Sequence, residues 1–456
     1  MSFRNDINMA EMIAQRVREL GGSCFYVGGF VRDLLLGKEN KDVDIEVHGV
    51  TPAQLEGILD SVGERISIGE SFGIYALKGY SLDIAMPRRE SQIGLGHKDF
   101  EVIVDPFIGI DRAALRRDFT INAMMQDVLS GETSDFHSGK YDVDHKIIRH
   151  VNSSTFIEDP LRVLRAAQFA ARFGFTVAEE TVSLCKNMDL SHLAKERVET
   201  ELKKALLKSK SPSTFFTVLR EMEQLDVWFP ELKDLIGVQQ NPKHHAEGDV
   251  WTHTMMVLDQ AVQYRENVQN PFAFMLSVLT HDMGKAVCTE MVNGEIHAYN
   301  HESLGLPLAE TFITRLTSET DVLKYVLNLT EMHMKPNMLA ADCASIKKTN
   351  KMFDKAIDPD ALIAIAVCDG LGKIAPREYV SYDNFFESRL SIYREYMSRP
   401  YVMGRDLVEA GIAPSSRYTD YLNYAHKLRL AGITKESALK QTISYALKME
   451  RKLQKE

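Results

Sequence analysis

The sequence of 456 residues lacks the features of secreted and membrane proteins. It has five cysteines, an odd number without a Cys-x-x-Cys pair, which favours reduced thiols over a disulfide framework. No apolar run approaches the roughly 20 residues of a membrane helix. The segment 1–20 also lacks the apolar core of a signal sequence. The sequence therefore predicts a cytoplasmic protein without a membrane span.

Positive charge is scarce as well, since the formal net charge is −10. Proteins that bind nucleic acid without sequence preference are usually basic, so the charge of the whole chain disfavours that class. A local exception lies at the C-terminal end, where Lys and Arg outnumber Asp and Glu after His426. This basic run is either a solvated helix face or a surface for RNA.

The length predicts several domains, because single cores rarely exceed about 250 to 300 residues. Short β-rich runs at 24–27, 43–47, 75–77, 82–86 and 100–104 alternate with helical patterns at 9–20, 52–62 and 113–125. After residue 151 the patterns are almost all helical. We therefore predict the α+β class, with a small α/β head that has a mixed sheet, followed by all-α regions. The expected regions are the head at 1–150, a neck and body at 151–240, a third region at 241–380 and a tail at 381–456.

The first motif combines two glycines with a pair of aspartates. Gly28 and Gly29 lack the Cβ that would keep the backbone away from a phosphate. Asp42 and Asp44 are two residues apart in an expected strand, so both side chains point to one face and can hold a divalent metal together. With Arg32 nearby for a triphosphate, the set suits metal-dependent nucleotidyl transfer. The alternative is a glycine turn before a solvent-facing acidic strand, because Asp-x-Asp spacing is common.

Two further motifs disfavour that alternative. Residues 116–124 read Arg-Arg-Asp-Phe-Thr-Ile-Asn-Ala-Met, and residues 158–165 read Glu-Asp-Pro-Leu-Arg-Val-Leu-Arg. With the first motif, and in the same order, they resemble the class II tRNA nucleotidyltransferases, which comprise the CCA-adding enzymes and their bacterial poly(A) polymerase relatives. The resemblance covers the first half of the chain. It implies CTP, ATP and tRNA as partners.

The resemblance also implies roles for individual residues. Asp42 and Asp44 would be the catalytic ligands of Mg²⁺, and Asp83 is a weaker candidate for a third carboxylate. Gln168 stands where many relatives carry another arginine, which leaves one phosphate or base contact open. The expected nucleotide-binding residues are Gly28, Gly29, Arg32, Asp33, Arg116, Arg117, Asp118, Asn122, Asp159, Arg162 and Arg165.

Asp159 and Arg162 have the hydrogen-bonding pattern that would select a base. On an expected helix they are three residues apart and share a face. Asp159 accepts hydrogen bonds and Arg162 only donates them, so the pair matches the edge of cytosine or adenine, where an amine lies beside a ring acceptor. Guanine and uracil present a carbonyl there. Selection of CTP and ATP is what the resemblance implies for this pair, and an exposed salt bridge is the alternative.

The second half of the chain has histidines and aspartates in or beside separate helical patterns. Such groups can meet in a bundle core and bind metal, although a single histidine on an apolar face is usually a core residue. The candidates are His253, His281, Asp282, His301, His333 and Asp369. Their order resembles the HD phosphohydrolase domain, with Lys285 placed to meet phosphate. The expected cofactor is Mn, Ni or Fe as a divalent ion, or Mg.

The motifs together predict a class II tRNA nucleotidyltransferase with an HD phosphohydrolase domain at 241–380. Its expected activities are the addition of CMP and AMP to tRNA 3′ ends, and hydrolysis as a phosphatase and 2′,3′-cyclic phosphodiesterase. A bacterial poly(A) polymerase is the main alternative, but those enzymes usually have a strongly basic tail in place of the HD domain. A nucleotide-sensing HD hydrolase is another, which the intact Asp42 and Asp44 disfavour. No feature of the sequence indicates an oligomeric state.

Overall fold

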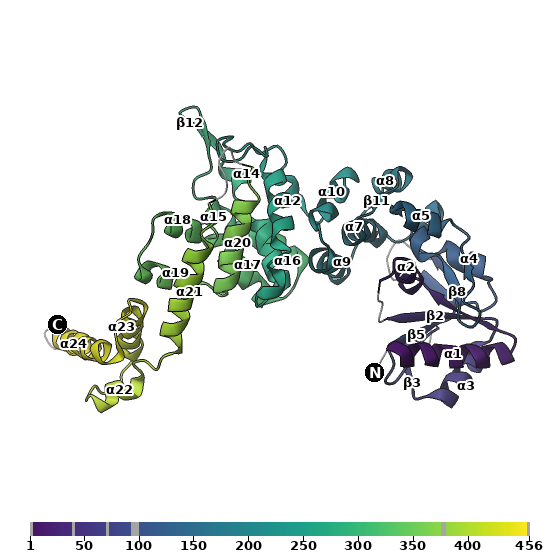
Figure 1. The fold of residues 1–456 in the computed structure, drawn as a ribbon, viewed down its shortest axis with the longest axis horizontal. Coiled ribbons are helices and arrows are strands. Elements are labelled where there is room, and N and C mark those ends of the chain that lie inside the picture. Colours follow the sequence, from purple (N-terminus) through teal and green to yellow (C-terminus); the bar gives the residue numbers. More distant parts are fainter. Residues whose placement is uncertain (1–2, 39–41, 70–72, 93–99, 375–379, 454–456) are drawn as a thin grey trace. The chain divides into compact units, whose positions relative to one another are not determined.

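The computed structural model describes residues 3–38, 42–69, 73–92, 100–374 and 380–453, and Figure 1 shows its fold. The chain divides into two compact units, Met1–Trp228 and Phe229–Glu456, called unit 1 and unit 2 below. Unit 1 contains a mixed sheet and unit 2 is largely helical, so the predicted α+β class is confirmed. The finer division into regions at 1–150, 151–240, 241–380 and 381–456 stays a prediction. None of the described helices is long and apolar enough to cross a membrane.

Unit 1 begins with the sheet and its covering helices and ends in helices alone. Its elements are α1 (Phe3–Glu19), β1 (Ser23–Val27), α2 (Gly29–Leu35), β2 (Val43–His48), α3 (Pro52–Val62), β3 (Arg65–Gly69), β4 (Ile74–Leu77), β5 (Leu82–Ala85), β6 (Arg88–Gln92), β7 (Phe100–Val104), α4 (Ile110–Leu115), the 3-10 helix η2 (Thr120–Asn122), β8 (Met125–Asp127), β9 (Thr133–Ser134), α5 (Gly139–His145), β10 (Ile147–Ile148), α6 (Ser153–Phe156), α7 (Leu161–Phe173), β11 (Thr176–Val177), α8 (Glu179–Cys185), α9 (Lys195–Lys208) and α10 (Ser213–Glu221).

Seven strands of unit 1 form one sheet in the order β3-β4-β5-β2-β1-β8-β9. The pair β2 and β5 is parallel, and the other neighbouring pairs are antiparallel. In the parallel pair, Asp44 is the register partner of Asp83. Register partners point to the same face of a sheet, so these two carboxylates lie side by side.

Helix α1 packs on β1 and β2, and α3 packs against α1, through buried aliphatic side chains (Figure 1). Ile13 and Leu59 are fully buried, and such side chains each contribute about 1.5 to 3 kcal/mol relative to exposure. The bounds of α3 are those predicted, because Thr51 and Gln54 form a capping box and Pro52 opens the helix.

The predicted helix over 113–125 is wrong. Helix α4 ends at Leu115, and a turn of 3-10 helix and strand β8 follow. The Asp118 carboxylate accepts from the Phe119 N–H at 2.8 Å, a local bond that competes with helix formation. Phe119 also forms a β-bridge with His150, so contacts with a distant segment replace the helical pattern.

Asp159 lies before helix α7, whereas the sequence placed it on a helix with Arg162. The helix begins at Leu161, and Pro160 occupies its N-cap position. A proline disfavours the α conformation in the residue before it, which explains why the helix does not extend to Asp159.

Unit 2 is a helical unit with one β-hairpin among its described residues. Its elements are α11 (Pro230–Lys233), α12 (Val250–Ala261), the 3-10 helix η3 (Arg265–Asn267), α13 (Pro271–Thr280), α14 (Lys285–Cys288), β12 (Glu290–Val292), β13 (Glu295–His297), α15 (His301–Leu304), α16 (Leu306–Leu316), α17 (Thr320–Met332), α18 (Lys335–Ala341), α19 (Ile346–Lys355), α20 (Pro359–Leu371), α21 (Asp383–Ser398), α22 (Gly404–Glu409), α23 (Tyr418–Leu430) and α24 (Lys435–Leu453).

Candidate active sites

Most of the predicted nucleotide-binding residues of unit 1 line one cavity of about 620 Å³. The predicted residues that line it are Gly28, Gly29, Arg32, Asp33, Asp42, Asp44, Asp83, Arg116, Arg117, Asp118, Asn122 and Arg165. Gln168 also lines it and is buried, and its Nε2 has no hydrogen-bond partner among the described residues. Asp159 and Arg162 are not among the described residues that line this cavity.

The acidic side of the cavity is a set of carboxylates on adjacent strands. Asp44 on β2 and Asp83 on β5 are register partners, and Asp42 immediately precedes β2. Burial and the charge of Asp83 raise the pKa of Asp44 to about 6. Oxygen donors that repel one another in this way form a donor set that suits Mg²⁺, because a divalent cation relieves the repulsion. The chemistry of these residues therefore fits the predicted ion.

Glycine brings the backbone close to this acidic set. Gly28 adopts φ +65°, a conformation that side chains other than glycine rarely take. A Cβ at this position would lie 3.2 Å from Arg117 Nη1 and 3.8 Å from Asp44 Oδ2. The absence of a side chain here thus leaves room beside both a carboxylate and a guanidinium group.

Glu46 holds the two arginines of the second motif. It lies two residues after Asp44 on β2, is buried, and accepts from Arg117 Nη2 at 3.1 Å and from Arg116 Nη2 at 3.4 Å. Burial alone would raise the pKa of Glu46, but the hydrogen bond from His48 and the charge of Arg117 lower it to about 2. The alternation Asp44-Ile45-Glu46 was the sequence signal for this residue, which the motif analysis missed.

Asp118 fixes a further arginine at the cavity. Arg165 Nε donates to Asp118 Oδ2 at 2.7 Å, and Asn122 Nδ2 donates to the other oxygen at 3.0 Å. The buried Arg32 donates to Asp33 at 2.8 Å and to Asn122 at 2.6 Å. Arg32, Asp33, Asn122, Asp118 and Arg165, which come from all three motifs, thus form one connected hydrogen-bond network.

Asp159 and Arg162 contact other parts of unit 1 and not each other's side chains. Arg197 Nη2 donates to Asp159 Oδ2 at 2.8 Å. Arg162 donates to two backbone carbonyls, that of Thr155 at 2.7 Å and that of Arg116 at 2.9 Å. Both side chains therefore have partners that a base would have to replace.

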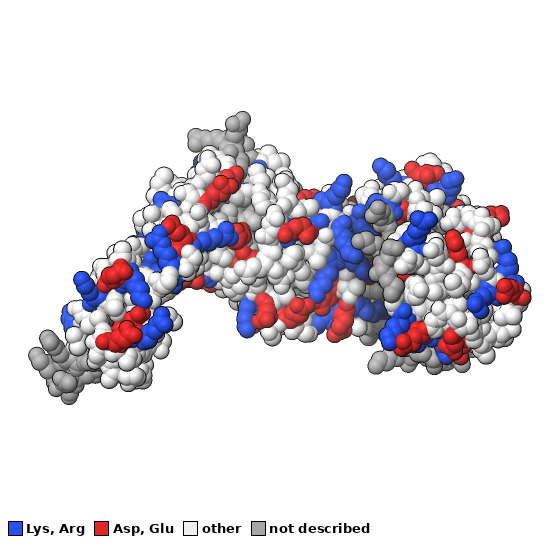
Figure 2. All heavy atoms as spheres, turned by 60° about the horizontal axis from the view of Figure 1, so that its bottom comes forward, with Lys and Arg blue, Asp and Glu red and all other residues white. Residues whose placement is uncertain are grey.

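Basic side chains from α7 and α9 line this cavity. Figure 2 shows Lys and Arg over the part of unit 1 that contains α7 and α9, and Arg172, Lys204 and Lys208 from these helices line the cavity. The chain is acidic as a whole, yet this surface is locally positive.

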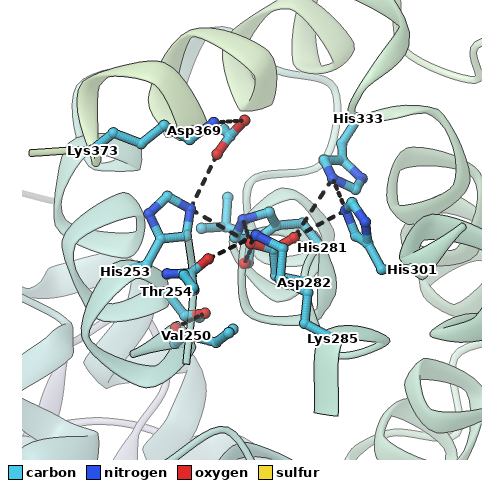
Figure 3. Close-up of polar contacts among 12 residues, drawn as sticks. Val250, His253, Thr254, His281, Asp282, Lys285, His301, His333, Asp369 and Lys373 are labelled. Atoms are coloured by element: carbon cyan, nitrogen blue, oxygen red, sulfur yellow. Dashed lines mark hydrogen bonds and ion pairs between the residues drawn. The ribbon is translucent and has the colours of Figure 1, made fainter. Parts of the chain in front are cut away.

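The six histidines and aspartates predicted in the second half converge in unit 2 (Figure 3). They come from helices far apart in the sequence: His253 lies on α12, His281 directly follows α13, and Asp369 lies on α20. His301 opens α15 and His333 directly follows α17. All of them are buried. The predicted meeting of several helices is confirmed.

The orientation of three histidines is fixed by their own backbone. The Nδ1 atoms of His281, His301 and His333 lie 2.7, 3.0 and 2.8 Å from the carbonyl oxygens of the residues three positions earlier. A carbonyl only accepts, so each Nδ1 carries a proton, and in the neutral form of each ring Nε2 presents a lone pair. His301 Nε2 and His333 Nε2 lie 3.3 Å apart.

Facing lone pairs of this kind fit a metal ion. His281 Nε2 is buried without a hydrogen-bond partner among the described residues, and it lies 3.2 Å from Asp282 Oδ2. Two ligand triads share this region, one of His253, His281 and Asp369 and the other of Asp282, His301 and His333. Nitrogen and carboxylate donors suit divalent transition metals, so the residues present can hold one or two such ions.

Charge is strongly concentrated in this cluster. Burial alone would raise the pKa of Asp282, but Lys285 at 2.7 Å and His281 hold it well below its usual value. Burial and the nearby His281 lower the pKa of His333 to about 3. Asp282 therefore stays ionised and His333 neutral, which are the forms that bind a metal.

Two groups beside the cluster were missed by the motif analysis. Glu247 Oε1 lies 3.0 Å from His253 Nδ1 and 2.7 Å from His245 Nδ1, so its carboxylate leaves His253 Nε2 directed at the cluster. Lys373 Nζ donates to Asp369 Oδ2 at 2.9 Å. Its spacing of four residues from Asp369 on α20 and the following turn was the available signal.

Close backbone packing requires a glycine at position 284, between the His281-Asp282 pair and Lys285. A Cβ on Gly284 would lie 2.0 Å from the His301 carbonyl oxygen, a backbone atom that cannot move away alone. The loop after α13 and the start of α15 therefore pack backbone to backbone, which brings His301 to Asp282 at 3.1 Å.

Two family models match the first half of the chain. Residues 24–149 match the family model described as "Poly A polymerase head domain". Residues 174–236 match the model described as "Probable RNA and SrmB- binding site of polymerase A".

Similar proteins extend this likeness beyond the matched segments. The chain is 39% identical over 316 residues to the Multifunctional CCA protein of Actinobacillus pleuropneumoniae serotype 5b (strain L20), covering 68% of this chain and 74% of that protein. It is 35% identical over 401 residues to the Multifunctional CCA protein of Pasteurella multocida (strain Pm70), covering 85% and 91%. A Thermotoga maritima CCA-adding enzyme complexed with tRNA matches with a TM-score of 0.63 at 20% identity, over 96% of this chain and 95% of that one. At that identity the likeness shows the shared fold.

Proposed function

Since this chain belongs to the family of multifunctional CCA proteins, we propose that unit 1 adds CMP and AMP from CTP and ATP to the 3′ end of tRNA and that unit 2 hydrolyses phosphate esters. The observation that carries the proposal is that the identity to a multifunctional CCA protein extends over most of the chain, which has one candidate site in each unit. A cytoplasmic location, where tRNA is processed, belongs to the same proposal.

In unit 1 the residues of the chain position the reactants. The ions held by Asp42 and Asp44 would neutralise the triphosphate and activate the 3′-hydroxyl of the RNA. Gly28 allows the backbone to approach the phosphates, beside Arg117. The buried carboxylate of Glu46 holds the Arg117 guanidinium in place, so this side chain needs little further ordering when the nucleotide binds.

The basic surface of unit 1 would bind the RNA backbone. Lys204 and Lys208 on α9 line the cavity, and such groups bind phosphates through charge, without reading sequence. Selection of the added nucleotide then has to come from within the cavity. The acidic net charge of the chain is compatible with this, because only a local surface is needed.

The assay that tests the first activity uses three tRNA transcripts, ending before CCA, after C and after CC. We expect the first two to accept only CMP when CTP or ATP is given alone, and the third to accept only one AMP. The reason is a single nucleotide site whose preference depends on the bound 3′ end. Addition of a long run of AMP to any transcript would instead identify a poly(A) polymerase, and no addition would refute the proposal.

Base selection is proposed for Asp159 and Arg162. In the structure Arg162 donates to the carbonyls of Thr155 and Arg116, and selection requires it to exchange one of these for a base. We expect Arg162→Ala to reduce discrimination among the four nucleoside triphosphates, with each lost pairing worth about 1 to 3 kcal/mol. The measurement is incorporation of each nucleotide alone.

The competing role of Arg162 is to brace the backbone at Arg116. Wild-type selectivity at a reduced rate in Arg162→Ala would assign it that role. Arg197→Ala is the matched control, because it removes a guanidinium that contacts Asp159 and leaves Arg162 in place. Loss of selectivity in both variants would identify Asp159 as the residue whose position matters.

Unit 2 is proposed to act as a phosphatase and 2′,3′-cyclic phosphodiesterase. A bound divalent metal would supply Lewis-acid activation of water and of the phosphoryl oxygen. The described ligands would hold Mn²⁺, Ni²⁺, Fe²⁺ or Mg²⁺, and Lys285 and Lys373 add positive charge beside Asp282 and Asp369. Hydrolysis at damaged RNA 3′ ends would regenerate the hydroxyl that unit 1 extends.

A further inference from the structure

A cavity of about 720 Å³ adjoins the cluster of histidine and aspartate side chains in unit 2. His301, Lys285 and Lys373 line one part of it, which is the part that contacts the cluster. His297 and Tyr299 line another part. The cavity is larger than a phosphate group needs, so it has room for a further part of the substrate.

The second part of the cavity is built on the hairpin of β12 and β13. Asn293 and Gly294 form its two-residue turn with φ of 52° and 81°, the conformation that tight hairpins require. Figure 1 shows the hairpin extending beyond the helices of unit 2. His297 ends β13, and Tyr299 follows it by two residues in the turn before α15.

These two rings are stacked. Their centroids are 5.0 Å apart and their planes differ by 9°. Tyr299 lines the cavity and is 57% exposed, so its ring remains accessible despite the stack with His297. A rigid pair of parallel rings that remains accessible is the arrangement on which nucleobases stack, and it does not depend on base identity.

Two residues that line the same cavity, Gln240 and Asn337, each have an unsatisfied amide atom. Gln240 Oε1 accepts from Lys285 Nζ at 2.8 Å, and Asn337 Nδ2 donates to the Ala366 carbonyl at 2.8 Å. The other atom of each amide, Gln240 Nε2 and Asn337 Oδ1, is buried without a hydrogen-bond partner among the described residues. One donor and one acceptor left in this state favour a polar ligand, because an unpaired buried group is costly.

The spacing along the chain fits one nucleotide. Tyr299 is two residues from the ligand His301, and two residues span at most about 7 Å. A base on Tyr299 would therefore hold its own ribose and phosphate next to the metal cluster. We propose that Tyr299, supported by His297, binds the nucleobase of the substrate and makes nucleotide and RNA ends the preferred substrates of unit 2, an inference that rests on the hydrolysis proposed above.

The test compares a substrate that has a base with one that lacks it. The substrates are adenosine 2′,3′-cyclic phosphate and glycerol 1,2-cyclic phosphate, each with the metal-loaded full chain. We expect Tyr299→Ala to raise KM for the adenosine substrate about tenfold or more with kcat retained, and to leave hydrolysis of the glycerol substrate unchanged. Tyr299→Phe keeps the ring and should behave as the wild type.

Tyr141→Ala is the matched control, because Tyr141 is 55% exposed and stacks on His145 in unit 1. Equal effects of Tyr299→Ala on both substrates, or no effect on either, would overturn the inference. If the wild type hydrolyses neither substrate, the proposed hydrolysis has failed. A binding measurement then tests separately whether Tyr299 binds the nucleobase. Calorimetric titration with adenosine 2′-monophosphate should then show weaker binding to Tyr299→Ala, whereas equal affinity would overturn it.

Discussion

We expect Asp42→Ala and Asp44→Ala each to abolish nucleotide addition to tRNA and to leave hydrolysis by unit 2 intact. Loss of one ligand removes about 4 kcal/mol of transition-state stabilisation, which is about a thousandfold in rate. Asp44 carries the larger expected effect, because it is the register partner of Asp83 and is half-buried in the acidic set. The measurement is single-turnover incorporation of CMP into a transcript lacking CCA, beside hydrolysis of a model phosphodiester.

Asp60→Ala provides the control for removing an acidic side chain from unit 1. Asp60 is 56% exposed on α3 and pairs only with Arg65 at the surface, a contact worth little. It should keep full activity. A folded Asp42→Ala protein that loses both activities would show that the two reactions share one site, contrary to the division proposed here.

We expect His281→Ala combined with Asp282→Ala to remove hydrolysis by unit 2 and to spare nucleotide addition. The double substitution deletes a member of each ligand triad, so neither triad can hold its ion. We expect the rate to fall at least about a thousandfold. We also expect transition metal to co-purify with the wild type, or to restore its activity after chelation, and to be lost from the variant when metal content is measured directly.

Nucleotide addition by the same preparation reports that unit 1 is folded, and circular dichroism reports the helices of unit 2. Asp321→Ala is the control in unit 2, since its side chain on α17 is 94% exposed. Chelator-treated wild type that hydrolyses adenosine 2′,3′-cyclic phosphate as fast as the metal-loaded form would contradict the prediction. Failure of every divalent metal to support hydrolysis would contradict it too.

The sequence predicted the parts of the fold that depend on local rules. Helix α3 has the predicted bounds because Thr51, Pro52 and Gln54 define its start. The family predicted from the motifs is confirmed by the relatives, and the buried histidines and aspartates meet as expected. These motifs are short and their residues act through fixed spacings, which a single sequence displays directly.

The parts that the sequence did not reveal depend on distant contacts. The segment after Arg116 pairs with the backbone near His150, which a local helical pattern does not indicate. Glu247 acts on His253 from the loop before α12, outside any periodic pattern. Asp159 is an intermediate case. The sequence shows Pro160, which disfavours the helical conformation in the residue before it, yet the prediction placed Asp159 on the helix.

The backbone hydrogen bonds of the three cluster histidines bear on how unit 2 assembles. Each acceptor lies three residues before its ring, so His281, His301 and His333 reach their binding form as soon as their own turn folds. The partners His253 and Asp369 are 116 residues apart and meet only when the helices dock. Contacts of short range form before those of long range. A metal added during refolding therefore meets single histidines that can already bind it before the complete set of ligands has formed. It would then join histidines in non-native combinations. The metal should be added only after the protein has refolded.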